Sequence, residues 1–183
     1  ARAEGRAHGA SARPSALAAL AVRSPAAETG FKSIFNGKDL SGWEGLTDFW
    51  SVRDGAITGQ TTAAKPTKGN TFLVWKGGNP ANFELRLSFR LTGQNDKEFA
   101  NSGIQYRSRV VDAAGFVVGG YQADIDLTGK YTGMLYEEKG RGILMGPGEK
   151  IRVGPIPAGQ KKAAVEKLGT VTSAAQLAAA YHK

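Results

Sequence analysis

The chain has 183 residues, a length that one hydrophobic core can support without disulfides or a structural metal. It contains no cysteine, which excludes disulfides and thiolate metal sites, and its two histidines, His8 and His182, lie near the chain ends, which argues against histidine-based zinc chemistry. The net charge is +8, but residues 31–140 contribute only +1, against +2 from residues 1–30 and +5 from residues 141–183. A nucleic-acid-binding protein concentrates basic residues on its folded body, so this distribution predicts solvated basic ends and no nucleic-acid partner.

The first 30 residues have the composition of a leader segment. Residues 15–22 form a short apolar run between Arg13 and Arg23, and residues 26–27 lie where a secretory signal would be cleaved. A disordered Ala-rich segment explains the same composition, and both interpretations place residues 1–30 outside the fold. No apolar run approaches the ~20 residues that a membrane-spanning helix needs, so no membrane span is expected.

From Phe31 onward the sequence consists of short apolar runs separated by Gly and Asn. Asp54-Gly55 joins the runs 50–53 and 56–58, and such a pair predicts a hairpin because both central turn positions need positive φ. The clearest strand is 82–91, where all odd-numbered positions are apolar and all even-numbered positions are polar, a pattern that predicts one buried and one exposed face. Short strands with turns between them predict an all-β sandwich or barrel rather than an α/β fold. The other expected strands are 31–35, 71–75, 102–109, 120–126, 131–136 and 142–145.

The C-terminal end has a different pattern. Ser173 and Gln176 have the spacing of a capping box, in which the first residue caps a helix and the second returns the hydrogen bond. Leu177 and Tyr181 then fall four residues apart, on one helix face. A short helix is therefore expected from about Ala174 to the chain end.

Three of the expected strands carry polar side chains at alternate positions, which together would form a candidate sugar-binding surface. Carboxylate, amide and guanidinium groups bind sugar hydroxyls through paired hydrogen bonds, although the solvated outer face of a sandwich would show the same alternation. Two details favour a site: two carboxylates stand two residues apart with no Lys beside them, and glycines at 103 and 119–120 indicate close backbone approach. The three rows are Glu84, Arg86, Ser88 and Arg90; Gln105 and Arg107; and Gln122, Asp124 and Asp126.

Other motifs carry weaker signals. The glycine-rich segments 140–142 and 146–148 lack the strand-to-helix setting of a phosphate-binding loop, so no nucleotide site is expected. Terminal histidines cannot build a Ser-His-Asp triad. Trp43, Trp50 and Trp75 each sit in an apolar run, which favours a place in the core over a role as sugar platforms.

Several segments, in order, resemble one known family, the 3-keto-disaccharide hydrolase domain, over residues 31 to about 183. Residues 31–43 are similar to its opening "lfnGkdLsgW" signature, and residues 50–57 are similar to its "W-x-v-x-d-G-x-i" hairpin. The remaining matches are Phe83-Glu84-Leu85, Asn101-Ser102-Gly103-Ile104 with Arg107, Gly120-Tyr121-Gln122 and Tyr131-Thr132-Gly133-Met134-Leu135-Tyr136.

The resemblance implies a concanavalin A-like jelly-roll β-sandwich, periplasmic or secreted, whose ligand is a glycoside already oxidised at C3. The family normally continues with a Trp-Asn strand, an Asn-Gly hairpin and a final strand, so residues 31–183 are expected to be a fragment of the domain, ending in a short C-terminal helix. The family pattern Gly-Tyr-Glu-x-Gln-x-x-Asp reads Gln122, Asp124 and Asp126 here, which leaves the identity of the catalytic acid open.

A ketone at C3 acidifies the C2 proton, so the glycosidic bond at C1 can break by elimination through an enolate, with water added later. Such a site needs a carboxylate base near C2 and a donor near the developing oxyanion. The candidates are Asp124 or Glu84 as base, Arg107 with Gln105 or Gln122 as oxyanion and hydroxyl contacts, Asp126 to orient a partner or hold a cation, and Arg86 and Tyr136 as further substrate contacts.

The sequence assigns no metal ligands, cofactor or oligomeric state. A non-catalytic, lectin-like carbohydrate-binding module is the competing hypothesis, since the fold does not dictate activity. A third is a partial fold with no independent function, whose open sheet edges would promote association.

Overall fold

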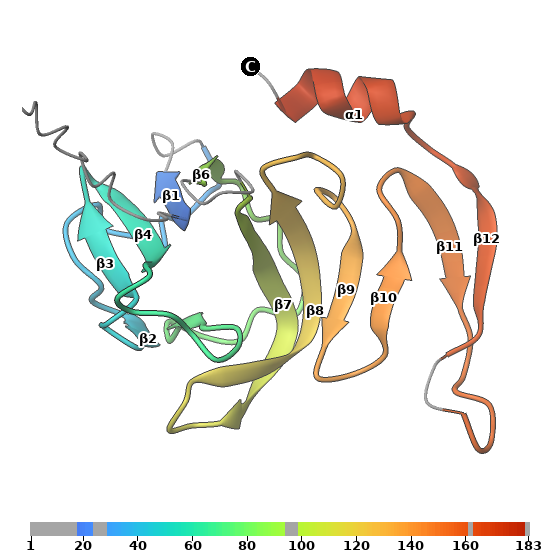
Figure 1. Cartoon of the computed structure of the whole chain (residues 1–183), viewed down its shortest axis with the longest axis horizontal. Helices are drawn as coiled ribbons and strands as arrows, with labels where there is room; N and C mark the ends of the chain where they lie inside the picture. Colours follow the sequence, from blue (N-terminus) through green and yellow to red (C-terminus); the bar gives the residue numbers. More distant parts are fainter. Residues whose placement is uncertain (1–17, 24–28, 94–98, 161–162, 182–183) are drawn as a thin grey trace, which may run out of the picture.

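The computed structural model describes residues 18–23, 29–93, 99–160 and 163–181. These ranges contain strands in short antiparallel ladders and one helix at the C-terminal end, so the expected all-β architecture is confirmed (Figure 1). The elements are β1 (Ala18–Arg23), β2 (Trp43–Gly45), β3 (Trp50–Arg53), β4 (Ala56–Thr61), β5 (Leu73–Trp75), β6 (Ser88–Thr92), β7 (Asn101–Asp112), β8 (Val117–Asp126), β9 (Leu135–Glu138), β10 (Gly142–Met145), β11 (Glu149–Val153), β12 (Val165–Thr170) and α1 (Ala174–Tyr181).

Two four-stranded sheets make up most of the fold. One has the order β3-β4-β1-β6 and the other the order β10-β9-β8-β7, while β2-β5 and β11-β12 form two-stranded ladders. In Figure 1 the first sheet lies on the left, the long strands β7 and β8 lie in the middle, and β9 to β12 continue to the right. The antiparallel sheets are those of an all-β sandwich, and the jelly-roll connectivity stays a prediction.

Strand β1 departs from the expectation that residues 1–30 lie outside the fold. Ala18–Arg23 pairs with β4 on one side and with β6 on the other, so this segment occupies an inner position of its sheet. The leader composition did not reveal this because backbone hydrogen bonds, which any sequence except proline can form, hold a strand in a ladder. The rest of the expected leader, residues 1–17 and 24–28, lies outside the described residues.

The segment 82–91 also differs from its prediction. Only its second half is a strand, because β6 pairs with β1 from Ser88 onward and residues 83–87 form no ladder. The apolar side chains expected on a buried face are substantially exposed, at 48% for Phe83, 43% for Leu85 and 40% for Phe89. Residues 82–91 therefore have the alternating pattern of a half-buried strand, but no described strand packs over their apolar side chains.

Several local predictions are confirmed. Asp54 and Gly55 both have positive φ and join β3 to β4, with Arg53 opposite Ala56. At the start of α1, the Gln176 backbone N–H donates to Ser173 Oγ at 3.2 Å, and the Ser173 backbone N–H donates to Gln176 Oε1 at 2.9 Å. This is the reciprocal pattern of a capping box. Residues 31–35 form no strand, and the β11–β12 hairpin was not predicted.

The tryptophans are half-buried and take structural roles. The Trp43 indole N–H donates to the Ile34 carbonyl at 3.0 Å, and that of Trp50 donates to Thr71 Oγ1 at 3.2 Å. Each thus ties an early loop or strand to another part of the chain. The buried apolar side chains are Phe35, Ala56, Ile57, Phe72, Ala100, Val118, Ile125, Met134 and Leu144. Among the described residues no helix is long and apolar enough to cross a membrane.

Candidate functional site

Polar side chains from β7, β8 and β9 meet on one face of the β10-β9-β8-β7 sheet. Gln105 lies opposite Gln122 in the β7–β8 ladder, and Gln122 lies opposite Tyr136 in the β8–β9 ladder. Residues that face each other across an antiparallel ladder project to the same side. Asp124, two residues along β8 from Gln122, shares this face. Four of the eight predicted site residues are therefore neighbours. Alternation had indicated this for Gln105, Gln122 and Asp124, and Tyr136 joins them through the β8–β9 pairing.

Gln105, Gln122 and Asp124 form a hydrogen-bonded chain, which we call the amide relay. Gln105 Nε2 donates to Gln122 Oε1 at 3.1 Å, and Gln122 Nε2 donates to Asp124 Oδ1. The Ser108 hydroxyl lies 2.9 Å from Gln105 Oε1 and donates to it. Every amide in the relay thus has its oxygen toward Ser108 and its nitrogen toward Asp124. The carboxylate sets this orientation, because an ionised carboxylate can only accept.

Gly103 makes room for the relay. It lies opposite Asp124 in the ladder, and a Cβ at this position would stand 2.5 Å from both Cγ and Cδ of Gln122. Gln122 is only 9% exposed, so it has little freedom to move aside. The close approach predicted from the Asn101-Ser102-Gly103 segment is present, and its cause is the side chain that holds Asp124.

Asp124 is buried, with 7% of its surface exposed. Burial raises the pKa of its carboxyl group, hydrogen bonds from Gln122 and Asn101 oppose this, and the charges of Asp126 and Glu138 add to the increase. The net pKa is above the ordinary value for aspartate. A carboxylate with a raised pKa binds a proton more readily than an ordinary one, which is the property of a general base.

Asp126 is buried as well, but its surroundings shift its pKa in the opposite direction. Its Oδ1 accepts from the backbone N–H groups of Tyr131 and Thr132, both at 2.8 Å, and its Oδ2 accepts from the N–H of Thr128 at 3.1 Å. Burial raises its pKa, but hydrogen bonds from the Thr128 and Thr132 hydroxyls and from the Tyr131 and Thr132 backbone N–H groups outweigh burial and lower it below the ordinary value. Asp126 thus closes the loop between β8 and β9 as an ionised group, which supports a positioning role.

The opposite pKa shifts reduce the repulsion between Asp124 and Asp126. These carboxylates stand two residues apart with no Lys beside them, so their charges repel unless a proton, a cation or a ligand relieves the repulsion. The donors around Asp126 keep its charge, while Asp124 takes a proton more easily. Pairs of titratable groups whose environments separate their pKa values are typical of acid–base sites.

Two residues of this face were missed in the sequence. Glu138 is 7% exposed and accepts from Asn70 Nδ2 at 2.6 Å, which ties the loop between β4 and β5 to the edge of the amide relay. Asn101 donates to Asp124 from the start of β7. Glu138 follows Tyr136 by two positions, so the period of two could have found it. Nothing in the local sequence signals Asn70, because its partner is 68 residues away.

Three other predicted residues, Arg107, Glu84 and Arg86, make side-chain contacts outside the relay. Arg107 sits at a register shift between Tyr106 and Arg109 with φ 47°, and its Nη2 donates to the Ala81 carbonyl at 3.0 Å. A bulge redirects the side chain of the residue within it, which alternation cannot anticipate. Glu84 and Arg86 are exposed and form an ion pair at 2.6 Å. Glu84 and Arg86 thus contact each other, and Arg107 contacts the loop before them.

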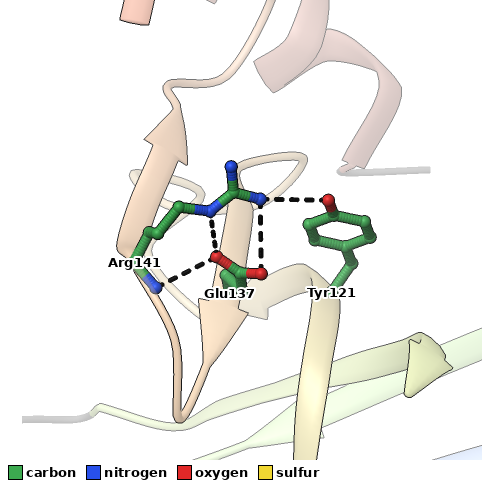
Figure 2. A network of polar contacts seen from close by, with 3 residues as sticks. All are labelled: Tyr121, Glu137 and Arg141. Carbon is green, nitrogen blue, oxygen red and sulfur yellow. Dashed lines mark hydrogen bonds and ion pairs between the residues drawn. The ribbon is translucent and has the colours of Figure 1, made fainter. Parts of the chain in front are cut away.

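A second polar cluster occupies the opposite face of the same sheet. Tyr121 and Glu137 lie opposite each other in the β8–β9 ladder, one position out of phase with Gln122 and Tyr136. Figure 2 shows the Arg141 guanidinium between them: Nη2 donates to the Tyr121 hydroxyl at 3.0 Å and to Glu137 Oε1 at 3.3 Å, and Nε donates to Glu137 Oε2. The Tyr106 ring lies 5.9 Å from the Tyr121 ring, centroid to centroid. This cluster joins β7, β8 and β9 from behind the relay.

We expect Arg141→Met to destabilise the fold by about 1–3 kcal/mol, because it leaves the half-buried Glu137 carboxylate without its charged donor. The Arg141 hydrogen bonds lower the pKa of Glu137 below its ordinary value of 4.5. The stabilisation is therefore present above that value and is lost as the pH falls through the lowered pKa. Urea unfolding at pH 7 and at acidic pH measures both effects.

Arg152→Met is the matched control, because Arg152 makes an exposed ion pair with Glu166 at 2.7 Å, with 68% and 59% of the side chains exposed. Exposed pairs contribute less than about 1 kcal/mol. If both variants lose the same free energy of unfolding, the Arg141 cluster stabilises the fold no more than an exposed ion pair does.

Within the described ranges no group of three or more His, Asp or Glu side chains is arranged to hold a metal ion. What the relay face offers is a carboxylate of raised pKa, two oriented amides and a tyrosine beside them. This set can accept a proton from a ligand and donate hydrogen bonds to its oxygens.

Comparison with known proteins gives one family. The family model described as the 3-keto-alpha-glucoside-1,2-lyase-like domain matches residues 30–174. The match includes the amide relay and the cluster behind it, and it agrees with the family that the motifs resemble. Neither the curated proteins nor the solved structures gave a match.

Proposed function

Since the chain belongs to the 3-keto-alpha-glucoside-1,2-lyase-like domain family, we propose that it cleaves glycosides oxidised at C3, with Asp124 as the general base. The observation that carries the proposal is the raised pKa of the buried Asp124 carboxylate at the end of the amide relay. The family description supplies the substrate class and the position of bond cleavage. The burial and raised pKa of Asp124 support its choice as the residue that begins the cleavage.

The chemistry follows from the ketone. A C3 carbonyl acidifies the C2 proton, because the electron pair left on C2 delocalises onto the C3 oxygen. Asp124 takes this proton, the C1–C2 double bond forms, and the bond from C1 to the glycosidic oxygen breaks. The departing oxygen takes a proton from the protonated Asp124 or from water, and water can then add to the unsaturated sugar.

The amides of Gln105 and Gln122 support the charge that develops. Each uses one N–H in the relay, and we propose that the second N–H donates to the C3 oxygen or to a neighbouring hydroxyl. Groups already oriented before the reaction stabilise a developing oxyanion at little reorganisation cost. Tyr136, which flanks Gln122, would contact the sugar beside them. Glu84, Arg86 and Arg107 keep their substrate roles as predictions, and the burial and raised pKa of Asp124 make it the preferred base.

The test is product release. We expect the purified chain to release glucose from 3-keto-trehalose or 3-keto-sucrose and to leave trehalose and sucrose intact. In D₂O, 1-deoxy-3-keto-glucose has no glycosidic group to lose, so proton abstraction should appear by NMR as deuterium incorporation at C2. Release from the unoxidised sugars at the same rate would overturn the proposal.

The lectin-like hypothesis predicts a different result in the same experiment. A binding module would bind the sugars, with neither glucose release nor deuterium exchange at C2. That outcome would remove the catalytic role of Asp124 and leave the relay as a sugar-binding surface.

A further inference from the structure

A second candidate site lies on the β3–β4 hairpin, in the other four-stranded sheet. A cavity of about 400 Å³ opens there, beside the segments that precede β3 and follow β4. None of its lining residues belongs to the amide relay, and in Figure 1 the hairpin lies at the left, away from β8 and β9. Small-molecule sites occupy cavities of this size range.

Alternate side chains of the β3–β4 hairpin project toward the cavity. Phe49, Ser51 and Arg53 alternate along the start and length of β3, so they project to one side. Gln60 is held opposite Phe49, because the Gln60 backbone N–H donates to the Phe49 carbonyl at 2.9 Å. Trp50 projects to the other side, where its ring covers Gly59. The cavity wall is therefore supported from behind.

The cavity lining carries an excess of positive charge. Asp48 and Lys65 pair at 3.0 Å across its rim, so the one carboxylate of the lining is neutralised within it. Arg53 adds a second cation at the end of β3. The lining thus attracts an anionic group, and a guanidinium binds a carboxylate best, through two parallel hydrogen bonds.

The remaining lining groups are neutral donors and acceptors. Hydroxyls of Thr47, Ser51 and Thr62 and the amide of Gln60 surround the cavity, and Phe49 provides an aromatic surface. Hydroxyls and planar amides suit the hydroxyl groups of a sugar, and an aromatic ring suits its C–H face. A bare inorganic anion is too small to contact most of these groups.

We propose that this cavity is a second saccharide site, separate from the amide relay, that binds a carboxylate-bearing sugar, with Arg53 as the carboxylate contact. A neutral sugar offers the Arg53 guanidinium only uncharged hydroxyls, which an amide in its place can also bind, so the charge selects a uronate over the matching neutral glycoside. The site binds through β3 and β4 and needs no residue of the relay.

The experiment is a titration of the full chain with methyl β-glucuronide and with methyl β-glucoside, followed by NMR or calorimetry. We expect the glucuronide to bind at least tenfold more tightly. Arg53→Gln should weaken glucuronide binding by tenfold or more and change glucoside binding by less than twofold. Arg53→Lys keeps the charge but loses the paired hydrogen bonds, so its affinity for the glucuronide should lie between those of the unaltered chain and Arg53→Gln.

Two controls separate this site from its alternatives. Asp124→Asn should leave glucuronide binding unchanged, so the result is independent of the proposed function of the relay. Arg109→Gln removes an exposed cation from β7 and should also have no effect. The proposal is overturned if the glucuronide does not bind, if Arg53→Gln binds it as tightly as the unaltered chain, or if inorganic phosphate competes at equal concentration.

Discussion

Asp124→Asn is expected to lower the rate of 3-keto-glycoside cleavage by about 10²–10⁴-fold, the usual contribution of a positioned general base. Asparagine keeps an oxygen that can accept from Gln122 Nε2, so the geometry of the relay is retained while the proton acceptor is lost. Glucose release and C2 deuterium exchange should fall together. The measurements are the initial rate of glucose release at saturating 3-keto-trehalose and the rate of deuterium incorporation at C2 of 1-deoxy-3-keto-glucose.

Two further variants make this result specific. Asp112→Asn alters an exposed carboxylate that closes the turn after β7, and it should leave the rate within about twofold of the unaltered chain, because the new side chain can accept the same turn hydrogen bonds. Glu84→Gln tests the other candidate base. If Glu84→Gln abolishes cleavage and Asp124→Asn does not, the base has been assigned to the wrong carboxylate.

The pH dependence gives an independent readout. The base acts when ionised, so cleavage should rise with pH through the raised pKa of Asp124, at a higher pH than an ordinary aspartate would require. A profile whose acid limb lies at or below the ordinary aspartate pKa of 3.8 would contradict the assignment.

The same shift predicts the sign of the effect on stability. Because the folded state raises the pKa of Asp124, its contribution to stability is fully present below the unfolded-state pKa and is lost as the pH rises through the folded-state value. At neutral pH the ionised group therefore costs stability, and Asp124→Asn should unfold at an equal or higher urea concentration. A variant that is inactive because it is unfolded would be recognised by this measurement.

Gly120→Ala is expected to have the largest effect on stability, about 3 kcal/mol or more. Gly120 has φ 147°, a conformation that is nearly restricted to glycine, and a Cβ there would lie 2.6 Å from the Ser108 Cα. The clash is with backbone, so a change of side-chain rotamer cannot relieve it. Urea unfolding of the two proteins gives the difference in free energy.

Gly129→Ala is the matched control for this prediction. Gly129 also has positive φ, at 74°, but a Cβ there meets nothing within 4 Å, so only the backbone conformation is penalised, by about 1–2 kcal/mol. Equal losses at the two positions would mean that β7 and β8 do not approach closely at Gly120. Because Ser108 contacts Gln105, the Gly120 variant should also reduce cleavage in whatever fraction remains folded.

Local signals in the sequence were reliable wherever neighbouring residues decide the structure. The Asp54-Gly55 turn and the Ser173 capping box formed as predicted, because turn conformation and helix capping depend on residues within three or four positions. Strand alternation likewise placed Gln122 and Asp124 on one face of β8, and Gln105 joined them because β7 and β8 pair in register. The family resemblance rested on these same local motifs.

Predictions failed where distant segments decide the structure. The alternation of residues 82–91 was read as a buried face, but burial of Phe83 and Leu85 requires a covering strand, and no described element covers them. Arg107 was expected beside Gln105, but the bulge in β7 turned it toward Ala81. Residues 18–23 were excluded for their composition, but the ladder positions beside β4 and β6 were filled through backbone hydrogen bonds.

By itself the sequence determined the all-β class, the family and the polar row that contains Asp124, because these depend on short-range patterns. Only the tertiary structure decided what that row can do. It buried Asp124 beside the charges of Asp126 and Glu138 and surrounded Asp126 with loop donors, and so moved two similar carboxylates to opposite sides of their ordinary pKa. Alternation cannot specify such shifts, since a pKa depends on burial and on charges that the fold gathers from separate strands.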